Sequence, residues 1–166
     1  MSASPSARHS SFTIERILPG RPSHAWRFWA DPALKQAWSG CHPDWTLLEQ
    51  VQDFRAGGRD FSRMRDTDGA IHSVDMRYLD LLQPRRILYA YTMHLDATPL
   101  SASLVTIELL PEGEATNMVY TEHLTMLAGD AELRRQGHGS WLRSAGAGNG
   151  ACTGRAAIEF HPPFVA

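Results

Sequence analysis

The sequence predicts a single α+β domain with a curved antiparallel sheet of about six or seven strands, two short helices early in the chain and a closing helix. Two observations predict this fold. Between residues 44 and 126, most segments alternate apolar and polar side chains with the period of two that is typical of half-buried strands. Turn-forming residues separate these segments, so that consecutive strands are joined as hairpins. Such a sheet buries one face, which helices must cover.

Composition narrows the class of protein. The 166 residues are enough for one domain with a sizeable core, and a formal net charge of −2 gives no attraction toward nucleic acid or an anionic membrane. Residues 1–11 are polar and lack the apolar core of a signal peptide, so we expect a disordered lead-in and a cytoplasmic protein. Cys41 and Cys152 lie far apart in unlike contexts, and we expect no disulfide framework.

The folded part is predicted to begin with a strand over Phe12–Leu18, which a Pro-Gly pair ends. A first helix opens at Pro22. The Asp31-Pro32 pair ends it and starts a second short helix that continues through Trp38. We expect the tryptophans of this region mainly to pack against the sheet, and Trp38 is a candidate wall for a ligand.

The middle of the chain is predicted to form a meander of strands. The expected strands cover residues 44–54, 58–65, 70–82, 87–94, 102–110 and 116–126. The turn at Asp66–Gly69 is the clearest hairpin signal, because Asp and Gly supply the left-handed conformations that it needs. One face of the later strands carries the bulkiest side chains, which are Ile87, Tyr89, Tyr91, Met93, Met118, Tyr120 and Glu122. We expect this face to be concave and covered by the helices.

The end of the chain departs from the pattern. Asp130 is placed to cap a helix that runs to Arg143, but four glycines between Gly146 and Gly154 cannot propagate it. Residues 144–166 are therefore an atypical Gly-rich tail, and we favour a shift of reading frame near Leu142 as its origin. The alternatives are a natural variant whose apolar residues cap a cavity, and a disordered segment.

Several phrases of the sequence resemble a known superfamily. They are Trp29-Ala30-Asp31-Pro32, Phe54-Arg55-Ala56-Gly57-Gly58, the stretch Leu79–Tyr89 and Tyr120-Thr121-Glu122-His123. With the element order, they are similar to the helix-grip superfamily called SRPBCC, or START/Bet v-like, and most of all to the family named after the activator of the heat shock protein 90 ATPase. The resemblance spans about Ser11 to Leu142, which is nearly the whole of the predicted domain, residues 12–143. It implies a long C-terminal helix gripped by the sheet, an apolar cavity between them, and a link to chaperones and the stress response.

The cavity is the expected functional site. Its candidate ligand-binding residues are Trp38, His72, Met76, Tyr89, Tyr91, Met93, Met118, Tyr120, Glu122 and Trp141. We expect a small, largely apolar ligand; the alternative interpretation is that the same residues fill an ordinary core. If the closing helix is truncated, an exposed apolar groove would favour a homodimer.

Two other functions remain open at this stage. The resemblance implies a co-chaperone that stimulates the chaperone ATPase, and a cyclase- or hydratase-type enzyme could use Glu122 or His72. We expect binding rather than catalysis, because we favour Glu122 as a structural partner of Arg77, His72 or a tyrosine hydroxyl. The histidines are scattered, so we expect no metal and no cofactor.

Overall fold

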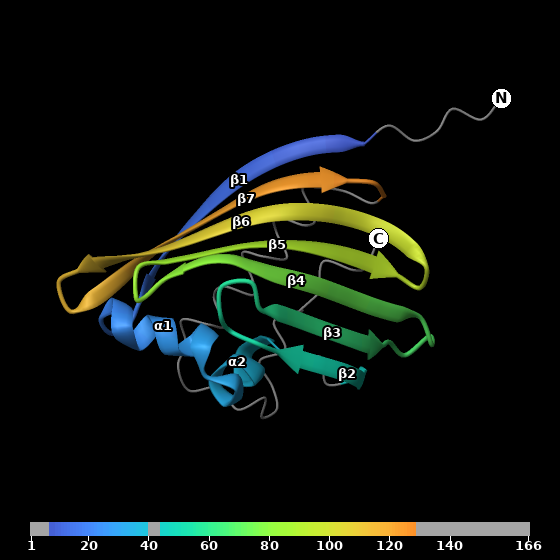
Figure 1. Cartoon of the computed structure of the whole chain (residues 1–166), viewed down its shortest axis with the longest axis horizontal. Helices are drawn as coiled ribbons and strands as arrows, with labels where there is room; N and C mark the ends of the chain where they lie inside the picture. The colour runs from blue at the N-terminus through green and yellow to red at the C-terminus, as the bar shows by residue number, and fades with distance from the viewer. Residues whose placement is uncertain (1–6, 40–43, 129–166) are drawn as a thin grey trace.

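Seven strands form one antiparallel sheet in this computed structural model, which describes residues 7–39 and 44–128. The strands are β1 (Arg8–Leu18), β2 (Thr46–Gln52), β3 (Arg59–Arg65), β4 (Ile71–Leu82), β5 (Arg86–Leu95), β6 (Thr98–Glu112) and β7 (Ala115–Met126), and the helices are α1 (Pro22–Ala30) and α2 (Pro32–Ser39). The sheet is curved, and both helices lie on its concave side (Figure 1). The predicted class and the order of these elements are confirmed; the predicted closing helix lies outside the described residues.

The first strand extends the meander by pairing with the last. The order in the sheet is β1-β7-β6-β5-β4-β3-β2, and β1 runs antiparallel to β7 from the Arg8–Met126 pair to the Leu18–Thr116 pair. The strand thus begins within residues 1–11, which the sequence predicts to be a lead-in. Its polar start gives no apolar signal, but backbone hydrogen bonds to β7 do not depend on side-chain polarity.

The concave face holds the core, because every second residue of the central strands points to it. Its buried side chains from β5, β6 and β7 include Ile87, Tyr89, Tyr91, Met93, Val105, Ile107, Leu109, Met118 and Tyr120. α1 covers part of this face with Ala25, Trp26 and Trp29, whose helical spacing puts all three on its buried side. The expected packing of the α1 tryptophans against the sheet is confirmed.

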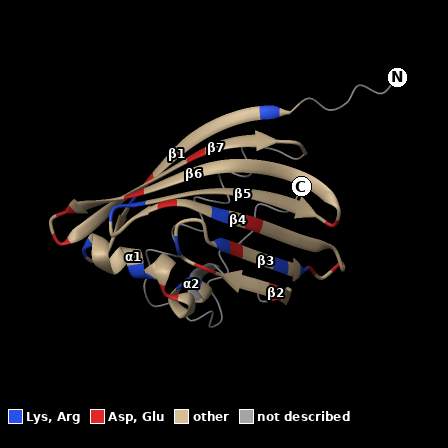
Figure 2. Ribbon diagram, viewed as in Figure 1, with Lys and Arg blue, Asp and Glu red and all other residues tan. Residues whose placement is uncertain are grey.

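The outer face of the sheet exposes both charged and apolar side chains. Figure 2 shows that much of the charge on the sheet lies on β3 and β4. There the guanidinium of Arg59 makes two hydrogen bonds, of 2.8 and 2.9 Å, to the carboxylate of Asp75. On β6, by contrast, Leu104 and Leu110 are each 41% exposed. No helix in residues 7–39 and 44–128 has the length and hydropathy to cross a membrane.

A β-bulge in β4 fixes the position of one core tyrosine. The pairing of β4 with β5 shifts between Tyr78 and Asp80. Next to this bulge, Tyr78 accepts a hydrogen bond from the backbone of Gly57 (2.7 Å) and donates one to Gly58 (3.0 Å). A Cβ atom on Gly58 would lie 2.0 Å from the carbonyl oxygen of Asp53, so only glycine allows this close approach.

Adjacent leucines on β6 provide a test of the sheet register. Leu109 is fully buried opposite Met118, whereas Leu110 points outward. We expect Leu109→Ala to lower the free energy of unfolding by about 2–5 kcal/mol, because it leaves a cavity in the core. Leu110→Ala should change it by no more than about 0.5 kcal/mol. Urea denaturation followed by circular dichroism measures both, and equal losses would contradict the assignment of inner and outer faces.

Candidate functional site

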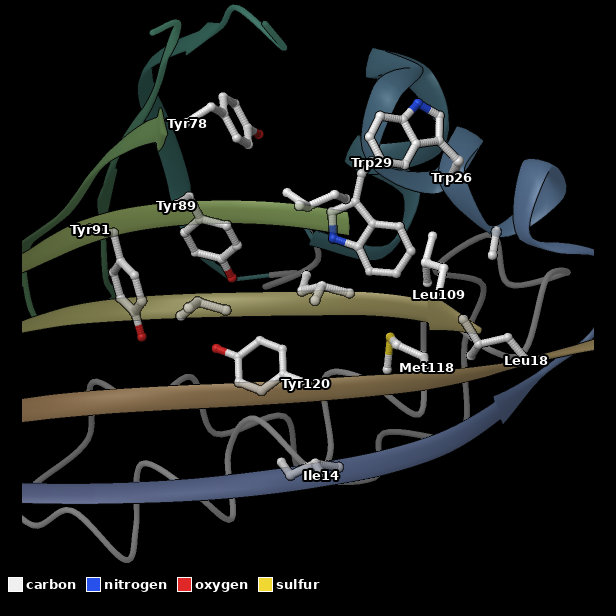
Figure 3. Close-up of a cluster of buried hydrophobic side chains, with 14 of the residues drawn as sticks. Ile14, Leu18, Trp26, Trp29, Tyr78, Tyr89, Tyr91, Leu109, Met118 and Tyr120 are labelled. Carbon is white, nitrogen blue, oxygen red and sulfur yellow. The ribbon is translucent and has the colours of Figure 1, made fainter. Parts of the chain in front are cut away.

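The predicted residues of β5 and β7 gather on the concave face. Tyr89, Tyr91, Met93, Met118, Tyr120 and Glu122 are all buried there. The strand pairing puts Tyr89 level with Val105 and Val105 level with Glu122, so these residues form one row across β5, β6 and β7. Figure 3 shows the rings of Tyr89, Tyr91 and Tyr120 on this face, with their hydroxyl groups turned toward the same region.

The carboxylate of Glu122 is the centre of this group. Its side chain is fully buried. The Tyr91 hydroxyl donates to Oε1 over 2.7 Å, and the Ser103 hydroxyl donates to the same oxygen over 2.6 Å. The Tyr120 hydroxyl donates to Oε2 over 2.9 Å. These three hydrogen bonds offset part of the large cost of removing a carboxylate from water.

A second tyrosine extends the hydrogen-bonded group. The side chains of Tyr89 and Tyr120 are hydrogen-bonded to each other. Because the hydroxyl proton of Tyr120 is donated to Glu122, Tyr89 must be the donor to Tyr120. Burial raises the pKa of both tyrosines well above the ordinary value, and the nearby Glu122 carboxylate adds to the rise. Both hydroxyls therefore stay neutral and keep their protons for donation near neutral pH.

These contacts show which of the expected partners of Glu122 forms a hydrogen bond with it. The tyrosine hydroxyl is confirmed as a partner. The two other candidates bind elsewhere: Arg77 donates to the backbone oxygen of Gly57, and His72 lies against Asp66. Arg77 follows the inward-facing Met76 in β4 and therefore points to the outer face, away from Glu122.

His72 is buried on the concave side but belongs to a separate cluster. Its Nε2 atom lies 2.7 Å from Oδ2 of Asp66, and its ring stacks on Trp45 with 4.3 Å between ring centroids. Tyr78, which pairs with Tyr89, follows His72 by six residues on β4. The two residues are therefore separated by roughly 20 Å along the strand. The two residues proposed for an enzyme, His72 and Glu122, are thus not brought together.

The three remaining candidate ligand-binding residues are Met76, Trp38 and Trp141. Met76 is half-buried and packs against the core. Trp38 belongs to α2, but the position of its side chain lies outside what the structure describes. Trp141 lies outside the described residues.

Sequence reasoning missed a second polar cluster on the concave side. Lys35 of α2 donates hydrogen bonds to the carboxylate of Asp60 on β3 and, over 3.0 Å, to the hydroxyl of Tyr78. That hydroxyl in turn donates to Asp60 over 2.9 Å. Asp31 positions Lys35, since its carboxylate caps α2 by accepting from the backbone of Ala33 at 2.9 Å. Alternation places Tyr78 inward, but no sequence pattern pairs it with Lys35.

The outer face carries an open groove of about 640 Å³ across β1, β7 and β6. Side chains of the outer face that line it are His9, Ser11, Ala102, Leu104, His123 and Thr125. His123 follows Glu122 in β7, so its side chain points to the opposite side of the sheet, as the sequence predicts. None of the described candidate residues lines this groove.

The sequence matches the family described as "Activator of Hsp90 ATPase homolog 1-like protein" over residues 20–146. A search of the curated proteins found no match.

Solved structures of bacterial proteins share the fold. A Rhizobium loti protein is 34% identical, with a TM-score of 0.80, over 87% of this chain and 99% of that chain. A Rhizobium leguminosarum protein is 36% identical, with a TM-score of 0.78, over 86% of this chain and 95% of that chain. A Chromobacterium violaceum protein, 24% identical with a TM-score of 0.67 over 82% and 94% of the two chains, supports the fold alone. The helix-grip fold is thereby confirmed.

The His72–Asp66 pair predicts a pH dependence of stability. The hydrogen bond with His72, and then those from the backbone of Ala70 and Asp68, hold the pKa of Asp66 below its usual value. A lowered folded-state pKa stabilises the fold above the unfolded-state pKa of about 3.9, and this contribution is lost as pH falls through the folded-state value. We therefore expect Asp66→Asn to be less stable than the parent chain at neutral pH, with the difference shrinking below about pH 4.

Urea unfolding at a series of pH values measures this difference. Asp68→Asn, in the same turn, is the control and should follow the parent chain. A constant difference between Asp66→Asn and the parent from neutral to acid pH would contradict the role given to the Asp66 carboxylate.

Proposed function

The chain belongs to the Activator of Hsp90 ATPase homolog 1-like family, and we propose that it binds a small, largely apolar ligand against the concave face of the sheet. One observation carries the proposal: an aromatic and methionine-rich face contains the fully buried carboxylate of Glu122, which is held by hydroxyl groups. Ligand sites commonly combine apolar walls with a few fixed polar groups in this way.

The two parts of this face would contribute differently to binding. Trp29, Tyr89 and Met118 would form apolar walls. Burying the apolar surface of the ligand against them would remove that surface from water and supply most of the affinity. Glu122 and Ser103 offer a polar end that would orient a ligand carrying an O–H or N–H donor. The proposed ligand therefore has an apolar body and one hydrogen-bonding group. We propose binding without catalysis by Glu122, because three hydroxyl groups already donate hydrogen bonds to its carboxylate, which leaves about one acceptor site for the ligand.

A fluorescence titration tests this proposal. Trp26 and Trp29 are buried in α1 against the concave face, so their emission should change when a ligand binds there. The panel comprises medium-chain alcohols, aromatic alcohols and fatty acids. At least one member should give a saturable change.

Adjacent residues of β7 supply the matched variants. Glu122→Gln should weaken binding of alcohols about tenfold or more, since hydrogen bonds to a charged group contribute about 1.5–3 kcal/mol. His123→Gln, on the outer face, should leave binding unchanged. Circular dichroism would check that both variants fold. Absence of saturable binding across the panel, or equal effects of the two substitutions, would rule out this site.

A second candidate function is stimulation of a chaperone ATPase, which the description of the matched family favours. Exposed apolar side chains on the outer face, including Ile17, Leu104 and Leu110, would offer contact surface to a protein partner. Adding the chain to a heat shock protein 90 ATPase assay would test this function. A saturable rise in ATP hydrolysis that Leu104→Asp lowers, while Glu122→Gln does not, is expected; no rise at any concentration would eliminate it.

A further inference from the structure

Lys35 is an unusual residue in this chain. The sequence contains 16 lysine and arginine residues, and Lys35 is the only lysine among them. It is also buried, with 9% of its surface exposed. The arginines Arg21 and Arg55, by comparison, form ion pairs with about 70% of their side chains in solvent. These two arginines carry surface charge, whereas the one side-chain amine of the chain lies inside.

The groups around this amine can donate and accept protons. The amine, the Asp60 carboxylate and the Tyr78 hydroxyl form a closed triangle in which each member is hydrogen-bonded to the other two. A carboxylate can take up a proton, and a phenol can donate one to a developing alkoxide. The side chains of Lys35 and Asp60 are only 11% and 12% exposed, so these transfers would occur largely away from water.

Tyr78 connects this triangle to the aromatic face. Its ring makes an edge-on contact with Tyr89, with 6.2 Å between ring centroids, and another with Phe54 at 5.0 Å. Tyr78 is also level with Tyr89 in the sheet, in the row that continues to Glu122. Figure 3 shows Tyr78, Tyr89 and Tyr120 following one another across the concave face. The amine therefore lies at the α2 end of the surface to which the ligand is proposed to bind.

We propose that Lys35 captures carbonyl compounds, and that the ligand class includes apolar aldehydes or ketones that form an imine with its amine. The inference rests on the proposed function, because the apolar body of the compound would bind the concave face. It adds a reactive group and a substrate class to that function.

The reaction balances with the groups present. The neutral amine of Lys35 attacks the carbonyl carbon and forms a C–N bond, while the carbonyl oxygen receives a proton from the Tyr78 hydroxyl. Asp60 accepts the proton that the nitrogen loses and returns one to Tyr78 through their hydrogen bond. The carbinolamine then loses its hydroxyl group with one further proton as water. The product is an imine and one water molecule, with no oxidant or reductant consumed.

Burial supports the reactivity of this amine. It lowers the pKa of Lys35 to about 8. The neighbouring Asp60 carboxylate favours the ammonium form and opposes this shift. With a pKa near 8, about a tenth of the amine would be neutral at pH 7, compared with less than about a thousandth at the ordinary lysine pKa of about 10.4. An arginine could not supply a neutral nucleophile.

Reductive trapping tests the proposal on the full chain. The protein is incubated with octanal and sodium cyanoborohydride, which reduces imines, and adducts are located by peptide mass mapping. Because the chain contains one lysine, only Lys35 and the N-terminal α-amino group can form stable adducts. We expect an octyl adduct on Lys35 that forms at least tenfold faster than the corresponding adduct with acetaldehyde, since only octanal can occupy the apolar face.

Variants and a competitor define the outcomes. Lys35→Arg retains the charge and should lose the adduct on that peptide. Tyr78→Phe should slow trapping at Lys35 and leave trapping at the N-terminus unchanged, which separates proton donation from a general loss of fold. Thermal unfolding would confirm that each variant is folded. Labelling of the N-terminus alone, or equal rates for octanal and acetaldehyde, would overturn the proposal.

Octanol separates this inference from the function on which it rests, because it can bind the face but cannot form an imine. If octanol binds saturably and Lys35 is not trapped by octanal, imine formation is wrong and ligand binding stands. If octanol does not bind, octanal does not react and fluorescence is unchanged across the panel, both proposals fail. Competition by octanol against trapping would support both.

Discussion

The burial of one carboxylate constrains the centre of this fold. Glu122 is fully buried in the middle of β7, where an ionised group without hydrogen bonds would cost several kcal/mol. The sheet itself supplies the hydrogen-bond donors. Tyr120 precedes Glu122 by two residues on β7, Ser103 lies on the neighbouring β6, and Tyr91 lies on β5. The curvature that turns these side chains toward one another also gives the domain its concave aromatic face.

Alternation along the strands was enough to predict the inner face. The positions of Tyr89, Tyr91, Met118 and Tyr120 follow from a period of two, because neighbouring side chains of a strand must point to opposite faces. The same rule placed Glu122 inward but could not name its partners. Those depend on the register between strands, which backbone pairing and bulges set over long distances in the sequence. Ser103 was missed for this reason: only the register reveals its position beside the carboxylate.

The cluster of Lys35, Asp60 and Tyr78 could not be predicted from sequence patterns, and the reason is different. Lys35 sits on a short helix, Asp60 and Tyr78 on two strands, and their meeting depends on how α2 crosses the concave side. The bulge after Tyr78 and the close approach that Gly58 permits set the position of the tyrosine. A compositional signal did exist, in the single lysine of an arginine-rich chain, but it indicates chemistry only once burial is known.

The choice of lysine can be argued on physical grounds. If the cluster served only to hold α2 on the sheet, arginine would suit it better, because its planar guanidinium binds a carboxylate through two hydrogen bonds and is less strongly hydrated than an ammonium. The chain makes that bidentate contact elsewhere, between Arg59 and Asp75. What lysine offers in exchange is an amine whose proton can be lost when water is removed. A buried lysine between a carboxylate and a phenol is therefore a costly anchor, and the proposed role as a nucleophile would account for that cost.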